Sequence, residues 1–464
     1  MLNVSETRNS LQPTKGGLRE TLAIALPMMI SYSCEIVMTF TDRIFLSRLS
    51  PEMMNAAMGG GLTFFMMMSF ILGLTGYSTA LVAQFLGAGR KDRCVVVLTQ
   101  ALMIAVAAYP LILIGRPFAY WLFQVVGVAP QQLVWQTVYF DTLIYAVIIS
   151  LLRNCFSCFF SGIGKTRVVM LASLTAMAVN GVADYILIFG KLGAPALGIR
   201  GAAFATIIGN FCGLVVLVAA FYARANREEY GVIRPLSFHW GVMKPLLRFG
   251  YPSGLEMFLN MLAYDMMVLI FHAAGPISAT ASTIVFDWDM VSFVPLVGIE
   301  IGVTSLVGRY MGARQPDIAH RATMSGLKLG LIYSSMVLIL FLGFPGYLVE
   351  IFRSDGTEAV FFQVKPMAVF MIQMASLYVL IEAMFVVFIG ALRGAGDTFW
   401  TMCLSVGLHW VLVPILYTIL HVFHMSPEAA WMALVLVFTG SSVLVYRRYY
   451  KGHWKQLKVI DQQV

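Results

Sequence analysis

Residues 20–48 read ETLAIALPMMISYSCEIVMTFTDRIFLSR, an apolar run long enough to cross a lipid bilayer as one helix. Pro27, Glu35 and Asp42 interrupt this run. Hydropathy followed outward from it, with segment ends set by charge, Pro and Gly, predicts twelve membrane-spanning helices. They cover about residues 20–48, 53–86, 94–115, 131–160, 167–190, 198–222, 243–274, 277–308, 321–345, 360–391, 398–421 and 427–447. The sequence therefore predicts an all-α polytopic membrane protein.

The composition agrees with this fold class. Of the 464 residues, 59% are hydrophobic and only 12% are charged, and the mean hydropathy is +0.81. A soluble globular protein carries about 25% charged residues, so a soluble enzyme, a disordered chain and a coiled coil are all excluded. Residues 1–17 lack the apolar core and cleavage site of a secretory signal. We therefore expect the first helix to remain in the mature protein.

The Lys and Arg residues fall unequally on the alternating loops. An even number of spans places both termini on one side, and 23 of the 31 basic residues fall on that side. Seven fall on the other side, and Arg153 lies within the fourth predicted span. Basic residues concentrate in short cytoplasmic loops. We therefore expect both the N- and the C-terminus to be cytoplasmic, and we attribute the net charge of +8 to these loops rather than to a nucleic-acid partner.

Three short motifs recur in the same order in the second half of the chain. Leu26-Pro27 matches Tyr251-Pro252, and FLGAG at 85–89 matches YMGAR at 310–314, both at an offset of 225 residues. GIGKT at 162–166 matches GAGDT at 394–398 at an offset of 232. Each half has six predicted spans, so the halves share one orientation and an axis along the membrane normal. We expect an N-lobe at 1–223, a charged cytoplasmic linker at 224–244 and a C-lobe at 245–464, with the binding cleft between the two lobes.

Ten carboxylates fall inside the predicted spans. They are Glu35, Asp42, Asp141, Asp184, Glu256, Asp265, Asp287, Asp289, Glu300 and Glu382. Each costs about 2.5–3.5 kcal/mol at the bilayer centre, so we expect them to face a wet or protein interior. Because Arg153 is the only unambiguous basic residue at that depth, we expect most of these acids to lack an ion-pair partner. Such an interior favours cations or holds protons.

Helical spacing sorts these acids by face. Glu35 and Asp42, seven residues apart, share a face of the first predicted helix. Asn180 and Asp184 share a face of the fifth. Carboxylates in a cleft of low dielectric constant attract a cation more strongly than they would in water. As residues that line the substrate cavity we expect Glu35, Glu256, Asn260, Glu300 and Glu382.

The sequence carries no motif that indicates catalysis. Cys155 and Cys158 form a CxxC inside an apolar helix without a second pair. Gly164-Lys165-Thr166 has Phe159 where a phosphate-binding loop needs glycine. We therefore expect no catalytic residue, no bound metal and no organic cofactor.

Several of these motifs resemble those of the multidrug and toxic compound extrusion (MATE) transporters, along nearly the whole chain. The resemblance rests on Pro27 with TDRIFLS at 41–47, QFLGAG at 84–89, Asn180 to Asp184, GIRGAA at 198–203 and GALRG at 390–394. It implies twelve transmembrane helices in two pseudo-symmetric six-helix lobes. It also implies a bacterial-type inner-membrane protein.

The family resemblance also implies which residues couple transport to an ion. Asp42, Asn180, Asp184 and a helix-six hydroxyl, best matched by Thr206, would form a cation or proton site in the N-lobe. Glu382 matches a helix-ten carboxylate of the NorM-like branch, whereas that branch's helix-seven glutamate falls on Asn260, with Glu256 one turn earlier. The N-lobe set is that of the DinF-like branch, so both branches stay open. Pro27 bends the helix that carries Asp42 and is a candidate hinge.

The resemblance implies secondary antiport, by alternating access, as the function. An inward flow of H⁺ or Na⁺ would drive export of small organic, mostly cationic amphipathic drugs, and we expect the chain to act as a monomer among membrane lipids. H⁺ is the favoured coupling ion, although oxygen ligands would also suit Na⁺. One alternative is a lipid-linked oligosaccharide flippase of the same MOP superfamily, which should present basic groups to a pyrophosphate. A non-transporting membrane receptor is an alternative from another class.

Overall fold

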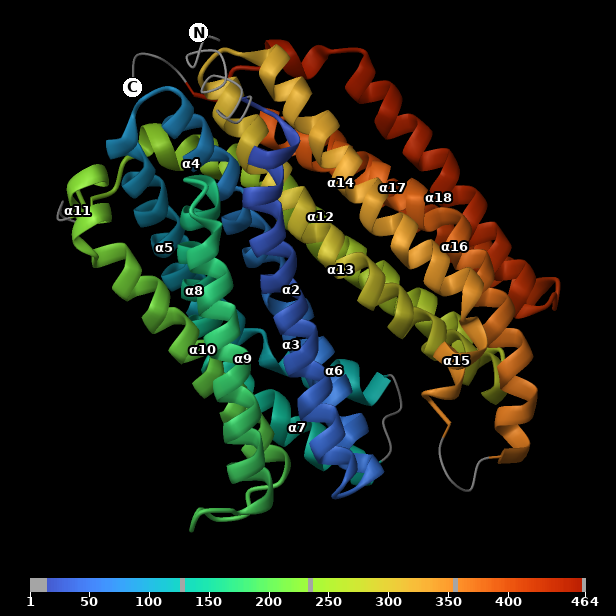
Figure 1. Ribbon diagram of the computed structural model, residues 1–464. Coiled ribbons are helices and arrows are strands. Elements are labelled where there is room, and N and C mark those ends of the chain that lie inside the picture. The colour runs from blue at the N-terminus through green and yellow to red at the C-terminus, as the bar shows by residue number, and fades with distance from the viewer. Residues whose placement is uncertain (1–14, 126–129, 233–236, 354–357, 461–464) are drawn as a thin grey trace, which may run out of the picture. The chain divides into compact units, whose positions relative to one another are not determined.

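The computed structural model describes residues 15–125, 130–232, 237–353 and 358–460, and every regular element in these ranges is a helix (Figure 1). Eleven of the helices are long and apolar enough to cross a membrane. A twelfth span results if α7 and α8, which meet at a bend of 51°, are counted as one broken span. The described part of the chain therefore holds eleven to twelve candidate spans, as the hydropathy pattern predicts.

The helices have the following bounds in chain order. They are α2 (Leu18–Ser47), α3 (Pro51–Gly76), α4 (Ser78–Gly87), α5 (Lys91–Ile114), α6 (Arg116–Val125), α7 (Pro130–Tyr145), α8 (Val147–Gly162), α9 (Thr166–Phe189), α10 (Ile199–Tyr222), α11 (Arg224–Tyr230), α12 (Trp240–Ala273), α13 (Pro276–Gly312), α14 (Pro316–Gly343), α15 (Pro345–Glu350), α16 (Glu358–Ala395), α17 (Thr398–Tyr417) and α18 (Pro427–Tyr450). A π-helical turn, Thr418–Val422, extends α17, and a 3₁₀ turn, His453–Gln456, follows α18. Pro27 lies inside α2, which remains helical on both sides of it.

The repeated motifs adopt the same backbone turn in both halves. Shortly after the ends of α4, α8, α13 and α16, one residue has a positive φ, namely Gly89, Gly164, Arg314 and Gly396. In each turn the next amide closes a hydrogen bond to the carbonyl five residues before it: Arg90 to Phe85 at 2.9 Å, Lys165 to Phe160 at 2.9 Å, Gln315 to Tyr310 at 2.8 Å and Asp397 to Leu392 at 2.8 Å. This is the bond pattern of a Schellman helix end. The turns obey the 225- and 232-residue offsets of the sequence repeat.

Close packing divides the chain into two compact units. Unit 1 contains Met1–Met29 and Leu262–Val459, and unit 2 contains Ile30–Met261 and Ile460–Val464. The boundaries between the units therefore fall inside α2 and α12 rather than in the linker. The sequence-based lobes at 1–223 and 245–464 remain a prediction about the evolutionary halves.

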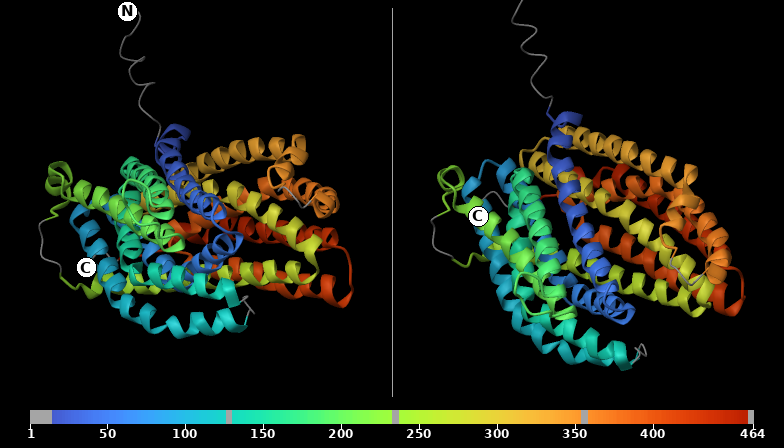
Figure 2. Two further views of the ribbon diagram at one scale, coloured as in Figure 1. Left: turned by 90° about the horizontal axis from the view of Figure 1, so that it is seen from below. Right: turned by 60° about the horizontal axis from the view of Figure 1, so that its bottom comes forward.

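In unit 2, α10 runs alongside α9, as Figures 1 and 2 show from three directions. The contact uses a stripe of small residues four apart: Gly201, Ala205, Gly209 and Gly213. A Cβ added at Gly201 would lie 2.6 Å from the Leu187 carbonyl oxygen, and one at Gly209 would lie 2.8 Å from that of Ala176. Small residues let helix backbones approach closely within a membrane. The stripe therefore sets the short distance between α9 and α10.

In unit 1, α16 packs in the same way against α13. A Cβ at Gly390 would lie 2.7 Å from the Glu300 carbonyl oxygen, and one at Gly394 would lie 2.6 Å from that of Thr304. The Thr304 hydroxyl donates to the carbonyl of Gly390 at 2.9 Å. Threonine thus satisfies its own polar group at a helix contact where no water is available.

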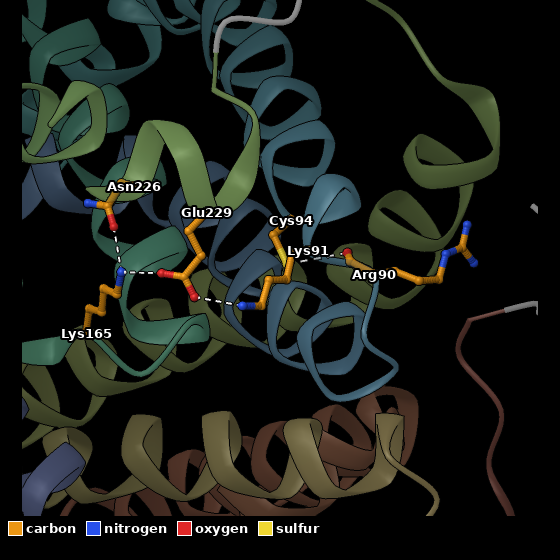
Figure 3. Close-up of polar contacts among 6 residues, drawn as sticks. All are labelled: Arg90, Lys91, Cys94, Lys165, Asn226 and Glu229. Carbon is orange, nitrogen blue, oxygen red and sulfur yellow. Dashed lines mark hydrogen bonds and ion pairs between the residues drawn. The ribbon is translucent and has the colours of Figure 1, made fainter. Parts of the chain in front are cut away.

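The predicted linker contains the short helix α11, which contacts the first residue of α5 and the connection between α8 and α9 (Figure 3). The Glu229 carboxylate accepts from Lys91 Nζ at 2.9 Å and from Lys165 Nζ at 3.0 Å, and Lys165 also donates to Asn226 Oδ1 at 2.6 Å. These two ammonium groups hold the pKa of Glu229 below its ordinary value. Further along, the Gln100 side chain donates to the carbonyl of Ser237 at 3.0 Å. Lys165, part of the Gly-Lys-Thr triplet, is therefore engaged by side chains of this chain.

Candidate functional site

Asp42 occupies the centre of a buried polar cluster in unit 2. Its side chain lies on α2, and only 6% of the residue is exposed. Asn180 Nδ2 on α9 donates to Asp42 Oδ1 at 3.1 Å. Thr206 Oγ1 on α10 donates to Asp42 Oδ2 at 2.9 Å. Three helices thus each contribute one side chain, and both carboxylate oxygens of Asp42 have a neutral donor.

Asp184 completes this cluster one turn after Asn180 on α9. It is fully buried, and its carboxyl group interacts directly with that of Asp42. Within the described ranges, no N–H or O–H donor of a neutral or basic group reaches either oxygen of Asp184. Two carboxylates in contact repel each other, and a single proton between them turns the repulsion into a hydrogen bond. The structure therefore brings together all four residues expected at the coupling site, in an arrangement that can hold one proton.

Tyr139 is a fifth member of the cluster and was not among the residues predicted from the sequence. It lies on α7, is buried, and its hydroxyl lies beside Thr206 within electrostatic reach of both Asp42 and Asp184. A tyrosine within an apolar helix gives no periodicity signal, and only the packing of α7 against its neighbours places it here. Its phenol adds a further proton donor to the cluster.

Glu35, two turns before Asp42 on α2, has a different kind of partner. Arg153 Nη2 on α8 donates to Glu35 Oε1 at 2.6 Å and to Ser173 Oγ at 3.0 Å, and Nη1 donates to Asn210 Oδ1 at 2.7 Å. The Ser173 hydroxyl in turn bonds to that of Ser31 at 2.7 Å. One guanidinium therefore ties together α2, α8, α9 and α10.

Glu300 on α13 is also paired with an arginine, Arg393 on α16. Arg393 lies just after the predicted span at 360–391, whereas the structure places it in the last turn of α16. Glu35 and Glu300, like Asp141 with Arg116, are therefore exceptions to the expectation that most of the ten intramembrane acids lack an ion pair. For Glu35 and Glu300 the arginine comes from a helix distant in the sequence.

Glu382 lies in unit 1 next to a second acid, Asp289. The two residues interact electrostatically across α16 and α13, and Tyr378, one turn before Glu382, donates its hydroxyl to Asp289. Tyr333 on α14 is also close to Glu382. The spacing on α13 did not connect Asp289 with Glu382, because the two residues lie 93 positions apart.

Glu256 and Asn260 lie one turn apart on α12, in the part of that helix that belongs to unit 2. Glu256 is buried, and Asn260 is half-buried. The five expected cavity residues thus divide between the units, with Glu35, Glu256 and Asn260 in unit 2 and with Glu300 and Glu382 in unit 1. Whether they line one cavity stays a prediction. Among the residues described, no three His, Cys, Asp or Glu side chains form a metal-binding group.

Comparison with known families gives one match that covers most of the chain. The family model described as MatE matches residues 27–186 and again residues 252–418. The second match begins 225 residues after the first and ends 232 residues after it, which are the two offsets of the internal repeat. The family unit therefore occurs twice in this chain.

Curated relatives and solved structures agree with this match. "Probable multidrug resistance protein NorM" of Thermotoga maritima is 25% identical over 451 residues, covering 96% of this chain and 95% of the relative. "Multidrug resistance protein PmpM" of Pseudomonas aeruginosa is 25% identical and covers 92% of this chain and 90% of its own. An outward-facing multidrug resistance MATE family transporter of the MOP superfamily superimposes with a TM-score of 0.85 at 20% identity, covering 96% of this chain and all of that one.

Proposed function

Because the chain belongs to the MatE family of multidrug efflux transporters, we propose that it is a secondary active antiporter that exports organic, mostly cationic amphipathic compounds in exchange for H⁺. One observation carries the choice of ion. Asp42 accepts hydrogen bonds from two neutral side chains, Asn180 and Thr206, while a second carboxyl group, Asp184, lies against it.

This arrangement supports proton exchange at the Asp42–Asp184 pair. The donors on both oxygens of Asp42 stabilise it as a carboxylate. A proton on Asp184 can then be donated to Asp42, and its loss leaves two buried negative charges in contact. The repulsion between these charges favours either the binding of a cationic substrate or a rearrangement of α2. Pro27 is our proposed hinge for that rearrangement during alternating access.

Sodium is the alternative coupling ion. Asp42, Asp184, Asn180 and Thr206 all carry oxygens, and oxygen ligands suit a hard cation. Against sodium, Asn180 and Thr206 present donor atoms to Asp42, and a cation at that point would have to displace both hydrogen bonds. The Asp289–Glu382 pair in unit 1 is a second place where a cation could bind.

The energy available from one proton is sufficient for this proposed export. A membrane potential of about 150 mV is worth roughly 3.5 kcal/mol per elementary charge. With full coupling and one net charge carried inward, this supports a substrate gradient of a few hundred-fold.

Two other functions remain as alternatives. A lipid-linked oligosaccharide flippase should present free basic groups to a pyrophosphate, whereas Arg153 and Arg393 are both engaged by glutamates. A non-transporting membrane receptor would leave the duplicated halves and the paired acids without a use. These observations favour the antiporter.

Reconstitution tests the proposed function directly. Purified protein in liposomes should take up a fluorescent organic cation when a pH gradient is imposed at constant sodium, and uptake should collapse when a protonophore is added. Uptake that follows a sodium gradient at fixed pH would reject H⁺ as the coupling ion. No uptake under either gradient would reject the antiporter.

The proposed location is the inner membrane of a bacterial-type cell, with both termini cytoplasmic. Single cysteines introduced at Lys191 and at Lys451 should label from opposite sides with a membrane-impermeant maleimide. Labelling from the same side would show that the topology is wrong.

A further inference from the structure

We propose that Arg153 is a built-in counter-cation of Glu35, which a cationic substrate must displace in order to bind. This inference rests on the proposed function, because it concerns how that transporter selects its cargo. It assigns a specificity-determining role to an arginine that neither the family resemblance nor the comparisons single out.

The ion pair is unequal in its exposure. The side chain of Glu35 is 44% exposed, whereas that of Arg153 is only 13% exposed. Arg153 keeps two further acceptors, Asn210 and Ser173, whereas the only partner recorded for the Glu35 carboxylate in the described chain is Arg153. The acid is therefore the accessible partner, and the arginine can remain hydrogen-bonded if the acid turns away from it.

The exposed carboxylate does not lie on the lipid side of α2. Val37 and Ile44 are exposed apolar residues on the same helix. At about 100° per residue they lie roughly 200° and 180° around the helix from Glu35. Asp42 lies within about 20° of Glu35. The helix thus has an apolar exposed side and, opposite to it, an acidic side that begins at Glu35 and leads to the Asp42 cluster.

The guanidinium is fitted closely into its place. A Cβ added at Gly213 on α10 would lie 3.0 Å from Arg153 Nε, so the absence of a side chain at Gly213 gives the guanidinium its space. A monovalent organic cation that approaches Glu35 must therefore compete with a group already held at hydrogen-bond distance. We infer that this competition weakens the binding of weakly attracted cations and favours substrates that can make additional contacts.

The test is a binding measurement that requires no ion gradient. Isothermal titration calorimetry of the full-length protein in detergent would compare tetraphenylphosphonium, a permanent cation, with triphenylphosphine oxide, its uncharged relative. Arg153→Gln should bind the cation about tenfold more tightly than the wild type, since Glu35 is released, and it should bind the neutral compound within twofold of the wild type. Glu35→Gln should bind the cation about tenfold more weakly.

A double-mutant cycle separates displacement from a merely structural role. The gain from Arg153→Gln should vanish when Glu35 is also replaced by Gln, because the two residues act as a pair. A matched control is Arg116→Gln, which removes an arginine from its ion pair with Asp141 elsewhere in unit 2 and should leave the affinity for the cation unchanged.

Ser173→Ala keeps the proposal testable if Arg153→Gln does not fold. It removes one of the two acceptors that keep Arg153 hydrogen-bonded when Glu35 turns away, so it should weaken cation binding, by a smaller factor than Glu35→Gln does. A folded Arg153→Gln that binds tetraphenylphosphonium no more tightly than the wild type, or a folded Ser173→Ala that binds it no more weakly, would overturn the inference. A wild-type protein that binds the cation but transports it under neither a pH gradient nor a sodium gradient would overturn the proposed antiport alone.

Discussion

Glu35 and Asp42 lie two turns apart on one face of α2, yet their surroundings differ in kind. Glu35 is half-exposed and faces a guanidinium. Asp42 is buried and faces an amide, a hydroxyl and a second carboxyl group. An arginine partner fixes the charge of a carboxylate, because the guanidinium does not lose its proton under physiological conditions. Neutral partners leave the charge free to change with a proton. The comparison teaches that the partner of an acid in a membrane helix, together with its burial, decides what it can do.

The largest expected effect is at Asp42. Asp42→Asn removes the carboxylate that faces Asp184, so ion-driven export should be abolished, while binding of an organic cation should be largely retained. Transport into liposomes under a pH gradient, with binding by calorimetry in parallel, measures both. Glu35→Gln is the matched control on the same face and should alter affinity for cations without abolishing coupling. Export by Asp42→Asn at the wild-type rate would show that Asp42 is not required for coupling and does not differ from Glu35 in this respect.

Breaking the Glu300–Arg393 pair should have the next largest effect, this time on stability. Arg393→Met leaves a buried glutamate without its arginine and should cost about 3–5 kcal/mol of folding free energy. Thermal unfolding in detergent, with the fraction folded followed by circular dichroism, measures it. The double variant Glu300→Gln, Arg393→Met should recover most of the loss. An Arg393→Met protein as stable as the wild type would mean that Glu300 is not held as a fixed charge.

A smaller effect is expected at Gly209, where a substitution changes helix packing rather than charge. Gly209→Ala places a methyl group 2.8 Å from the Ala176 carbonyl oxygen and 3.0 Å from Asn180 Cβ, so it should cost about 1–3 kcal/mol and slow coupled transport by shifting Thr206 away from Asp42. Gly407→Ala is the matched control, because nothing lies within 4 Å of its added Cβ. Equal transport by both variants would show that the spacing between α9 and α10 is not critical.

The smallest effect concerns the docking of α11 by Glu229. Its pKa is lowered in the folded state by Lys91 and Lys165, so its contribution to stability is complete above the ordinary pKa of about 4.5 and is lost as the pH falls through the folded pKa. Glu229 is more than one third exposed, and solvent screening keeps the contribution below about 1 kcal/mol. Hydrogen exchange of residues 224–230 should rise slightly in Glu229→Gln at pH 7. Arg224→Gln is the control, and an identical rise there would mean that the Lys91–Glu229–Lys165 contact does not dock α11.

The membrane-spanning elements were predictable from the sequence because hydropathy is a local property. The first predicted span, 20–48, corresponds to α2 at Leu18–Ser47, and the last, 427–447, to α18 at Pro427–Tyr450. The break between α7 and α8 at Ala146 was not predicted, since no proline or glycine marks it. Motif resemblance supplied the four residues of the coupling site, Asp42 included, which hydropathy alone could not have linked.

The two arginine–glutamate ion pairs could not be predicted from the sequence, for a different reason. Arg153 and Glu35 are 118 positions apart, and Arg393 and Glu300 are 93 positions apart. Helical periodicity relates residues on one helix, whereas these contacts depend on which helices become neighbours. The same limit hid Tyr139 and the contact of Asp289 with Glu382.

The glycine stripe on α10 has a consequence for how this protein tolerates variation. Gly201, Gly209 and Gly213 have no side chain, yet an added Cβ would lie within 3 Å of a carbonyl oxygen of α9 at the first two and 3.0 Å from Arg153 Nε at the third. A saturation mutagenesis screen for drug resistance should therefore find inactive variants in two classes, one at the acids and one at these positions. In the second class almost every replacement would be harmful. Among related sequences, these glycines should therefore be replaced less often than many of the polar residues that surround them.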